Sequence, residues 1–227
     1  MTEVDAWWSS KMRTSILVDN DSWILPFAEK LVKMIREQGH FCELKRAQGD
    51  LSEGDVCFFL GCTQIVREAN LKKHRQNLVV HASDLPKGRG FSPLTWAILN
   101  GEHCLTVKLL EAAKDVDAGD IYETGLIQFE GHELLPELRR KLGDETLALC
   151  LSYLSSEKPP IGVKQQGSPT WLKRRTPEDS RLDPEKTILS QINLLRVVDN
   201  EAYPAFFELH GRRYILKIEA SSEGETD

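Results

Sequence analysis

The sequence lacks the long apolar runs, paired cysteines and excess of basic residues that mark several classes of protein. No apolar stretch approaches the ~20 residues of a membrane-spanning helix, so we expect no membrane contact. The five cysteines are scattered without a C-x-x-C pair, which favours reduced thiols. The 29 Lys and Arg against 35 Asp and Glu give a net charge of −6, which disfavours nucleic acid as a partner. The first residues also lack a signal-peptide pattern, and we expect a cytoplasmic protein.

Strand-like and helix-like segments alternate through residue 154. The expected strands are 15–18, 41–44, 56–60, 78–80, 105–109 and 121–129, and the expected helices are 23–38, 66–75, 93–99 and 133–153. This alternation predicts an α/β fold, a Rossmann-like domain with a mostly parallel sheet, over residues 12–160. The strand 56–60 is wholly apolar and is expected at the centre of the sheet. Gly143 interrupts the apolar stripe of the last helix and predicts a kink or a break there.

The rest of the chain, residues 161–220, predicts a small C-terminal α+β subdomain with a linker. A polar, irregular stretch comes first, then a helix over 184–198 and a hairpin of strands 206–209 and 214–218. A length of 227 residues suits one large domain with such an appendage. Residues 1–11 are expected to form an irregular lead-in, and the last seven residues are expected to be disordered.

The stretch 79–102 carries the pattern most typical of a functional site. A short apolar strand ends at His81, a loop containing Gly88 and Gly90 follows, and Ser92-Pro93 predicts a helix start with Ser92 as N-cap. Strand ends followed by such loops are where α/β proteins place chemistry. A lone histidine is more often a structural partner, but Asp117 lies in a turn after a second strand and could face it. A His–Asp pair there would give a base of near-neutral pKa and a carboxylate that orients it.

The segment from His81 to Glu102, HASDLPKGRGFSPLTWAILNGE, resembles the signature of the folate-dependent formyltransferases. The turn Asp117–Ile121 is similar to a second motif of that family. RRTPED at 174–179 and NLLR at 193–196 resemble tail motifs of its methionyl-tRNA formyltransferase and UDP-aminosugar formyltransferase branch. The similarity covers nearly the whole chain after residue 12, in four motifs that occur in the family's order.

The resemblance implies formyl transfer from 10-formyltetrahydrofolate to an amine, through a tetrahedral oxyanion and without a metal. His81 would be the acid–base group that also helps to hold the oxyanion. Asp117 would orient His81 and assist removal of the amine proton. The family's folate contacts would fall, largely through the backbone, on Cys62, Thr63, Gln64, Ile65, Ala113, Asp115 and Val116.

The sequence departs from the family at one position that bears on catalysis. The family has Asn two residues before the histidine, and this chain has Val79. Loss of one oxyanion donor costs on the order of 3 kcal/mol elsewhere, so Ser83, Asn100 or a backbone amide would have to replace it. Asn77, four residues before His81, would lie roughly 7 Å too far back along the strand. A catalytically inactive relative that only binds its ligands is therefore the competing interpretation.

A nucleotide-linked amino sugar fits the short, weakly basic tail better than a tRNA does. The variant motif is most similar to sugar N-formyltransferases of the pseudaminic acid type, which act on a UDP-linked 4-amino-4,6-dideoxy sugar. A methionyl-tRNA formyltransferase-like enzyme is the alternative, and a homodimer is left open. Trp23 could stack on the base or lie in the core, and Lys87 and Arg89 could meet the pyrophosphate or stay solvated. The expected substrate contacts are Asn20, Asp21, Ser22, Trp23, Lys87, Gly88, Arg89 and Gly90.

Overall fold

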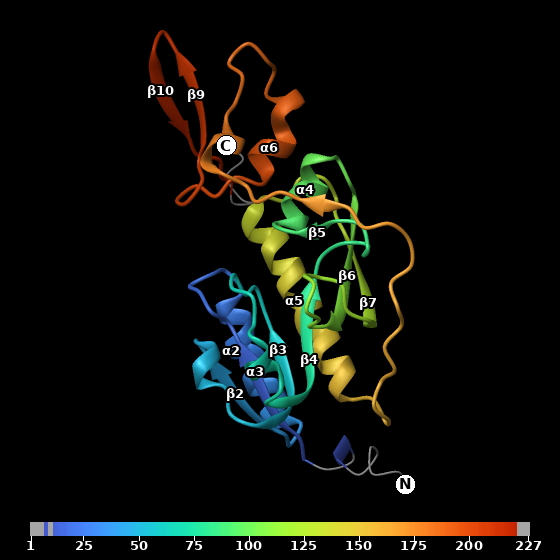
Figure 1. Ribbon diagram of the computed structural model, residues 1–227. Coiled ribbons are helices and arrows are strands. Elements are labelled where there is room, and N and C mark those ends of the chain that lie inside the picture. Colours follow the sequence, from blue (N-terminus) through green and yellow to red (C-terminus); the bar gives the residue numbers. More distant parts are fainter. Residues whose placement is uncertain (1–6, 9–10, 222–227) are drawn as a thin grey trace.

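The protein, described by a computed structural model for residues 7–8 and 11–221, consists of a sheet with helices and a tail at one end (Figure 1). The six-stranded sheet has the order β2-β1-β3-β4-β6-β7. Strands β2, β1, β3 and β4 are parallel, β6 runs antiparallel to β4, and β7 pairs antiparallel with β6 and so has the direction of the first four. This confirms the predicted α/β fold and the inner position of β3. The strands are β1 Arg13–Leu17, β2 Phe41–Lys45, β3 Gly54–Phe59, β4 His74–His81, β6 Cys104–Glu111 and β7 Ile121–Gln128.

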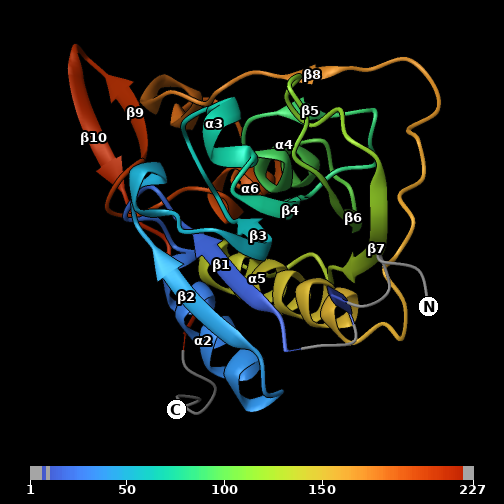
Figure 2. The same cartoon turned by 60° about the horizontal axis from the view of Figure 1, so that its bottom comes forward.

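Two helices, α2 Leu25–Glu37 and α5 Leu135–Leu154, cover one face of the sheet side by side (Figure 2). Their apolar stripes bury Leu31 and Leu138 in the main core. The break between two helices that Gly143 could have marked does not occur, because α5 is a single helix of 20 residues. A Cβ at position 143 would lie 2.4 Å from the ring of Phe27, so glycine there allows α2 and α5 to approach closely.

The opposite face carries little cover. The helix predicted over 66–75 is only α3 Glu68–Leu71, because β4 already begins at His74. On this face lie α3, the short 3-10 turn η1 Gln48–Asp50, and a small apolar cluster that includes Phe59 and the half-buried Val79.

Helix α4 covers Pro93–Leu99 as predicted, with Ser92 at its N-cap position and Pro93 in its first turn. Ser92 has a left-handed backbone with φ of 53° and makes no side-chain cap. Ser92 thus holds the predicted N-cap position without capping through its side chain, since a capping residue normally has an extended backbone.

The tail contains the predicted hairpin, β9 Ala205–Leu209 with β10 Arg212–Leu216. The helix predicted over 184–198 is wrong, because only the 3-10 turn η3 Leu189–Gln191 and the short α6 Ile192–Arg196 form there. Before them, β8 Trp171–Leu172 pairs in parallel with β5 Arg89–Gly90, and η2 covers Pro177–Ser180. The domain boundary near residue 160 stays a prediction. The expectations for residues 1–11 and for the last seven fall largely outside the described residues.

The tail is held to the body by a buried ion pair between Arg196 on α6 and Glu133, which lies just before α5. The guanidinium Nη2 lies 3.2 Å from the Glu133 carboxylate, and Nε donates to the Glu133 carbonyl at 3.1 Å. Within the described part of the chain, no helix combines the length and the apolar character that crossing a bilayer would need.

Candidate active site

A cavity of about 630 Å³ opens where strands β3 and β4 end and where the tail meets the body. Its wall includes the end of β4, the loop after β3, the turn after β6, part of α5 and several residues of the tail. A volume of this size is typical of small-molecule sites. The cavity therefore brings together segments that are far apart in the sequence, and both His81 and Asp117 line it.

His81 is the last residue of β4, and its side chain is 8% exposed. Its Nε2 lies 2.7 Å from the carbonyl oxygen of Gly88. Because a carbonyl only accepts hydrogen bonds, Nε2 must carry a hydrogen and donate it. In the neutral ring Nδ1 is then free of hydrogen, and it is the nitrogen that can take up a proton.

Asp117 faces that nitrogen, with Oδ2 3.5 Å from Nδ1 of His81. The same oxygen accepts a hydrogen bond from the amide of Gly90 at 2.9 Å. The expected arrangement of two loops at neighbouring strand ends is only partly met, because β6 is antiparallel to β4 and Glu111 pairs with Leu78. Asp117 therefore approaches from beside the middle of β4. The pair can bind a proton at Nδ1 and stabilise the resulting charge.

One side of the cavity is formed by the loop after β3, and Cys62, Thr63, Gln64 and Ile65 all line it. Asp19, which was not among the predicted site residues, accepts hydrogen bonds from the backbone amides of Thr63 and Gln64 at distances from 2.9 to 3.1 Å. Burial raises the pKa of Asp19, but these hydrogen bonds and one from Asn20 outweigh it and lower the pKa overall. Asp19 thus stays ionised and fixes the loop backbone.

The turn after β6 forms the adjoining wall. Ala113 and Val116 line the cavity, whereas Asp115 is not part of its lining. Burial raises the pKa of the Cys62 thiol to about 12, and its Sγ contacts the carbonyl of Leu17 at 3.3 Å. Cys62 is therefore a neutral wall residue and no nucleophile.

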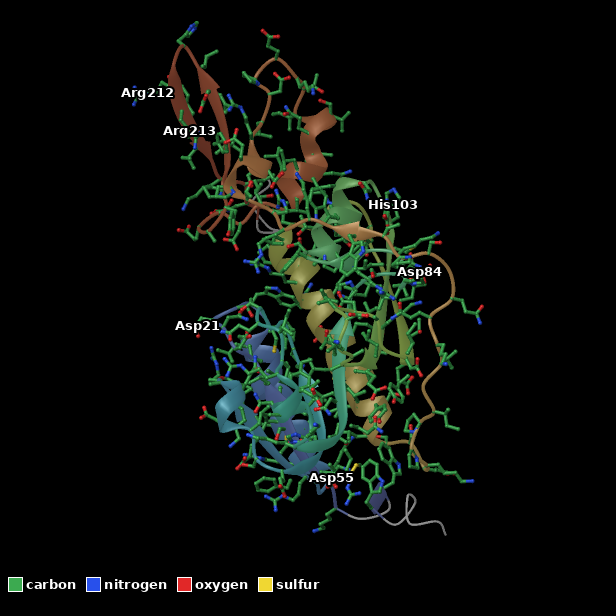
Figure 3. The ribbon with its side chains drawn as sticks, in the orientation of Figure 1. Asp21, Asp55, Asp84, His103, Arg212 and Arg213 are labelled. Carbon is green, nitrogen blue, oxygen red and sulfur yellow. The ribbon has the colours of Figure 1, made fainter. Side chains whose placement is uncertain are left out.

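The loop after β1 contributes only its C-terminal end to the lining of the cavity. Trp23 lines the cavity and also contacts the Phe27 ring edge-on, at 6.0 Å between centroids. Asn20, Asp21 and Ser22 are not in the lining. Asn20 donates to the carbonyl of Gly61, and the Asp21 side chain is 94% exposed beside Arg46 (Figure 3).

Residues of the loop after His81 face two different hollows. Gly90 lines the cavity, but Lys87 lines a separate hollow of about 400 Å³. Arg89 donates to the side chain of Gln165 at 2.7 Å, and the amide of Gly88 donates to Thr170. The charges of Lys87 and Arg89 therefore do not reach the cavity where a pyrophosphate was expected to meet them.

Neither side chain expected to replace the missing asparagine reaches the cavity. Ser83 donates to the carbonyl of Lys87 at 2.9 Å, and Asn100 is exposed at the end of α4. Val79 itself lines the cavity, and Asn77 donates to the carbonyl of Leu71. Of the side chains considered for holding the oxyanion, His81 is thus the one that lines the cavity.

The sequence analysis also missed the positive charges of the opposite wall. Arg174 lies with its guanidinium 4.5 Å from the centre of the Phe91 ring, and both line the cavity. Arg139 on α5 pairs with Asp199 at 2.9 Å in the same wall. Among the described residues, no group of three or more His, Cys, Asp or Glu side chains could hold a metal ion.

Comparison with known proteins yields no matching family model. The chain is 27% identical over 161 residues to the methionyl-tRNA formyltransferase of Malacoplasma penetrans, covering 68% of this chain and 50% of that protein. It is 30% identical over 153 residues to the enzyme of the same name from Streptococcus suis, covering 64% and 47%. The chain thus spans about half the length of these curated relatives.

Solved structures resemble nearly the whole chain. A methionyl-tRNA formyltransferase from Clostridium thermocellum superposes with a TM-score of 0.77 at 22% identity, covering 94% of this chain and 95% of that one. HypX from Aquifex aeolicus in complex with tetrahydrofolic acid gives 0.72 at 19%, covering 92% and 38%. A 4-N formyltransferase from Francisella tularensis gives 0.67 at 14%, covering 93% and 99%. The chain therefore has the fold of these formyltransferases.

Proposed function

We propose that this chain is an N-formyltransferase that moves the formyl group of 10-formyltetrahydrofolate to the amine of a nucleotide-linked sugar. The acceptor we favour is a UDP-linked 4-amino-4,6-dideoxy sugar. The observation that carries the proposal is the His81–Asp117 pair, which opens on a cavity with a largely uncharged wall on one side and a cationic wall on the other. HypX, a structure of the same fold, was solved with tetrahydrofolic acid, which supports a folate donor.

The wall formed by the loop after β3 and the turn after β6 suits a pterin. Gln64 and Ile65 line this wall, Asp19 holds the backbone at Thr63 and Gln64 in place, and Val79 and Leu110 give apolar contact. Cys62, Thr63, Ala113 and Val116 complete this wall and would hold the donor. Bound 10-formyltetrahydrofolate supplies an activated one-carbon acyl group.

His81 carries out the proton transfers in this proposal. Nδ1 takes up the proton that the acceptor amine loses as it attacks, and the Asp117 carboxylate stabilises the imidazolium that forms. The Nδ1 hydrogen would then be donated to the folate nitrogen that carried the formyl group, as the bond between that nitrogen and the formyl carbon breaks and tetrahydrofolate leaves. Because Val79 has no donor, we assign to protonated His81 the electrostatic stabilisation that the family shares between two side chains.

The opposite wall would bind the acceptor. Arg174 is held over Phe91, and no carboxylate pairs with it among the described residues, so its charge is available to a diphosphate. Arg139 is already paired with Asp199. We therefore assign phosphate recognition to Arg174 in place of Lys87 and Arg89. Trp23 lines the cavity as well and stays our candidate for stacking on the base.

A methionyl-tRNA formyltransferase-like activity is the second candidate, favoured by the names of the curated relatives. Arg212 and Arg213 on the hairpin could reach nucleic acid (Figure 3). Arg213, however, pairs with Glu208 at 2.9 Å, and the chain carries a net charge of −6. Affinity for tRNA depends on unpaired cations that neutralise phosphates, so we favour the sugar. Because Val79 stands where the family has an asparagine, a catalytically inactive relative that only binds its ligands is the third interpretation.

An acceptor panel tests the proposal. The protein would be mixed with 10-formyltetrahydrofolate and UDP-, GDP- or dTDP-linked 4-amino sugars or charged initiator tRNA, and release of tetrahydrofolate followed by absorbance. We expect release with a nucleotide sugar. Release with charged tRNA and with no nucleotide sugar would identify tRNA as the acceptor and refute the sugar proposal. Tight folate binding without release on any acceptor would favour the interpretation that the protein is a catalytically inactive relative.

A further inference from the structure

The chain that leaves α5 runs back along the sheet beside the edge strand β7 before it reaches β8 (Figure 1). Residues 163–172 of this return segment add two short pairings to the body. Val163 bridges Ile121 at the start of β7, and β8 pairs with β5 in the loop that follows His81. The return segment therefore touches both loops that carry the His81–Asp117 pair, although neither Gln165 nor Thr170 lines the cavity.

Gln165 joins the two loops through its side-chain amide. Its Nε2 donates to the carbonyl oxygens of Asp117 and Gly119, at 2.8 and 2.9 Å. Its Oε1 accepts from the guanidinium of Arg89 at 2.7 Å. The amide uses both hydrogens and its oxygen, so all the links depend on one planar group with a fixed orientation.

The backbone at Asp117 needs such support. Asp117 has a φ of 52°, the left-handed region that a side chain other than glycine adopts at a cost. Two residues on, a Cβ at Gly119 would lie 2.0 Å from the carbonyl oxygen of Glu111, so the turn is pressed against the end of β6. The two bonds from Gln165 hold the backbone of this turn, and hence the direction in which the Asp117 carboxylate points.

The same segment orients His81. The peptide between Gly88 and Arg89 donates its hydrogen to the carbonyl of Thr170 at 3.0 Å and presents its oxygen to Nε2 of His81. The hydroxyl of Thr170 accepts the preceding amide, that of Gly88, at 2.8 Å. Thr170 thus fixes the acceptor that sets the tautomer of His81, while Gln165 fixes Asp117.

We propose that Gln165 is a positioning residue for catalysis, which holds the Asp117 carboxylate against His81 from outside the cavity. The inference rests on the proposed function for its kinetic consequence but not for its structural one. A shift of about 1 Å in a catalytic group can cost roughly 100-fold in rate. Loss of the two hydrogen bonds to the turn is therefore expected to lower kcat far more than it changes the KM for either substrate.

The test compares Gln165→Met and Gln165→Glu, which both lose the amide donor, with Gln166→Glu as the control. Gln166 is exposed and makes no hydrogen bond among the described residues, so it matches the charge change one position away. The first readout needs no substrate. It is the hydrogen-exchange rate of the Gly90 amide, which donates to Asp117, measured by NMR against the amide of Leu109 in β6.

We expect both Gln165 variants to speed exchange at Gly90 by roughly tenfold or more, with Leu109 unchanged, because two hydrogen bonds of the turn are lost. Unaltered exchange at Gly90 would overturn the proposal whatever the enzyme's acceptor is. If the proposed function is wrong, only the kinetic readouts are lost, and the exchange measurement still tests the structural role of Gln165.

The kinetic readouts are kcat and a double-variant cycle. We expect kcat to fall roughly 10- to 100-fold in both Gln165 variants and less than about twofold in the control. In the Asp117→Asn background, Gln165→Met should add little, because the group that it positions is already lost. If the fold-loss of kcat in the double variant equals the product of the losses in the two single variants, Gln165 acts independently of Asp117 and the proposal is contradicted.

Discussion

Replacing Glu133 by glutamine should destabilise the protein more than any exposed charge change, because Glu133 is the buried anchor of the tail. Its side chain is 3% exposed. One carboxylate oxygen accepts the amide of Glu130 and the ammonium of Lys141, and the other accepts the amide of Gly131 and the guanidinium of Arg196. Glutamine keeps one acceptor and turns an NH₂ group toward donors, which leaves the 5% exposed Arg196 without its counter-charge.

The magnitude follows from two separate arguments. Burial raises the pKa of Glu133, but Lys141 and the surrounding amides outweigh it and lower the pKa from 4.5 to about 2. That difference corresponds to roughly 3 kcal/mol of stabilisation of the ionised form. Removing one partner of a buried ion pair costs about 3–5 kcal/mol in measured cases. We therefore expect Glu133→Gln to lose about 3 kcal/mol of the free energy of unfolding.

The pH dependence has a definite sign. Since the folded-state pKa lies below the ordinary value, the unfolded chain binds more protons between the two values. The contribution of Glu133 is present above about pH 4.5 and is lost as the pH falls toward 2. The variant should show a flatter decline of stability over that range.

Chemical denaturation followed by tryptophan fluorescence measures the effect at neutral and acid pH. Glu130→Gln is the matched control. The Glu130 side chain is 73% exposed three residues away, and the substitution keeps the hydrogen bond from the backbone amide of residue 130 to the Glu133 carboxylate. A loss below about 1 kcal/mol for Glu133→Gln, equal to the control, would refute the buried-anchor argument.

Three further predictions use local geometry. Gly143→Ala should cost about 1–3 kcal/mol in denaturation experiments, since the new methyl meets an aromatic ring at 2.4 Å, whereas Gly49→Ala, with open space, should be neutral or stabilising. Arg174→Ala should raise the KM for the nucleotide sugar roughly tenfold with kcat nearly kept, and Lys87→Ala should change neither; equal effects in steady-state kinetics would remove the phosphate assignment. Iodoacetamide should label Cys104 first, because it is the exposed one of the five thiols, and mass spectrometry showing an earlier site would contradict the burial pattern.

Sequence periodicity predicts elements that bury a clear face. The wholly apolar stretch 56–60, most of which belongs to β3, lies inside the sheet as expected, and helix α4 covers the predicted residues. The errors occur where tertiary contacts decide. The expected break at Gly143 is instead a close approach of two helices. The tail helix is short because residues 183–191 form turns, in which the Gln191 side chain bonds the backbone amide and carbonyl of Asp183.

The candidate site divides in the same way. A motif could indicate His81 and Asp117, since their residue types and loop positions carry the chemistry. No local pattern could show that Lys87 faces a different hollow, or that Arg174 lies 4.5 Å from Phe91 across the cavity. Those placements depend on the return segment, which meets the loop after β4 across roughly eighty positions of sequence.

The most direct test of the central claim is a single-turnover reaction with formyl-labelled 10-formyltetrahydrofolate and the best acceptor, in the original protein and in His81→Asn. We predict label on the sugar nitrogen with the original protein. The variant should transfer it at least about a thousandfold more slowly while folding and tetrahydrofolate affinity stay nearly unchanged. Transfer at an undiminished rate by the variant would contradict the account.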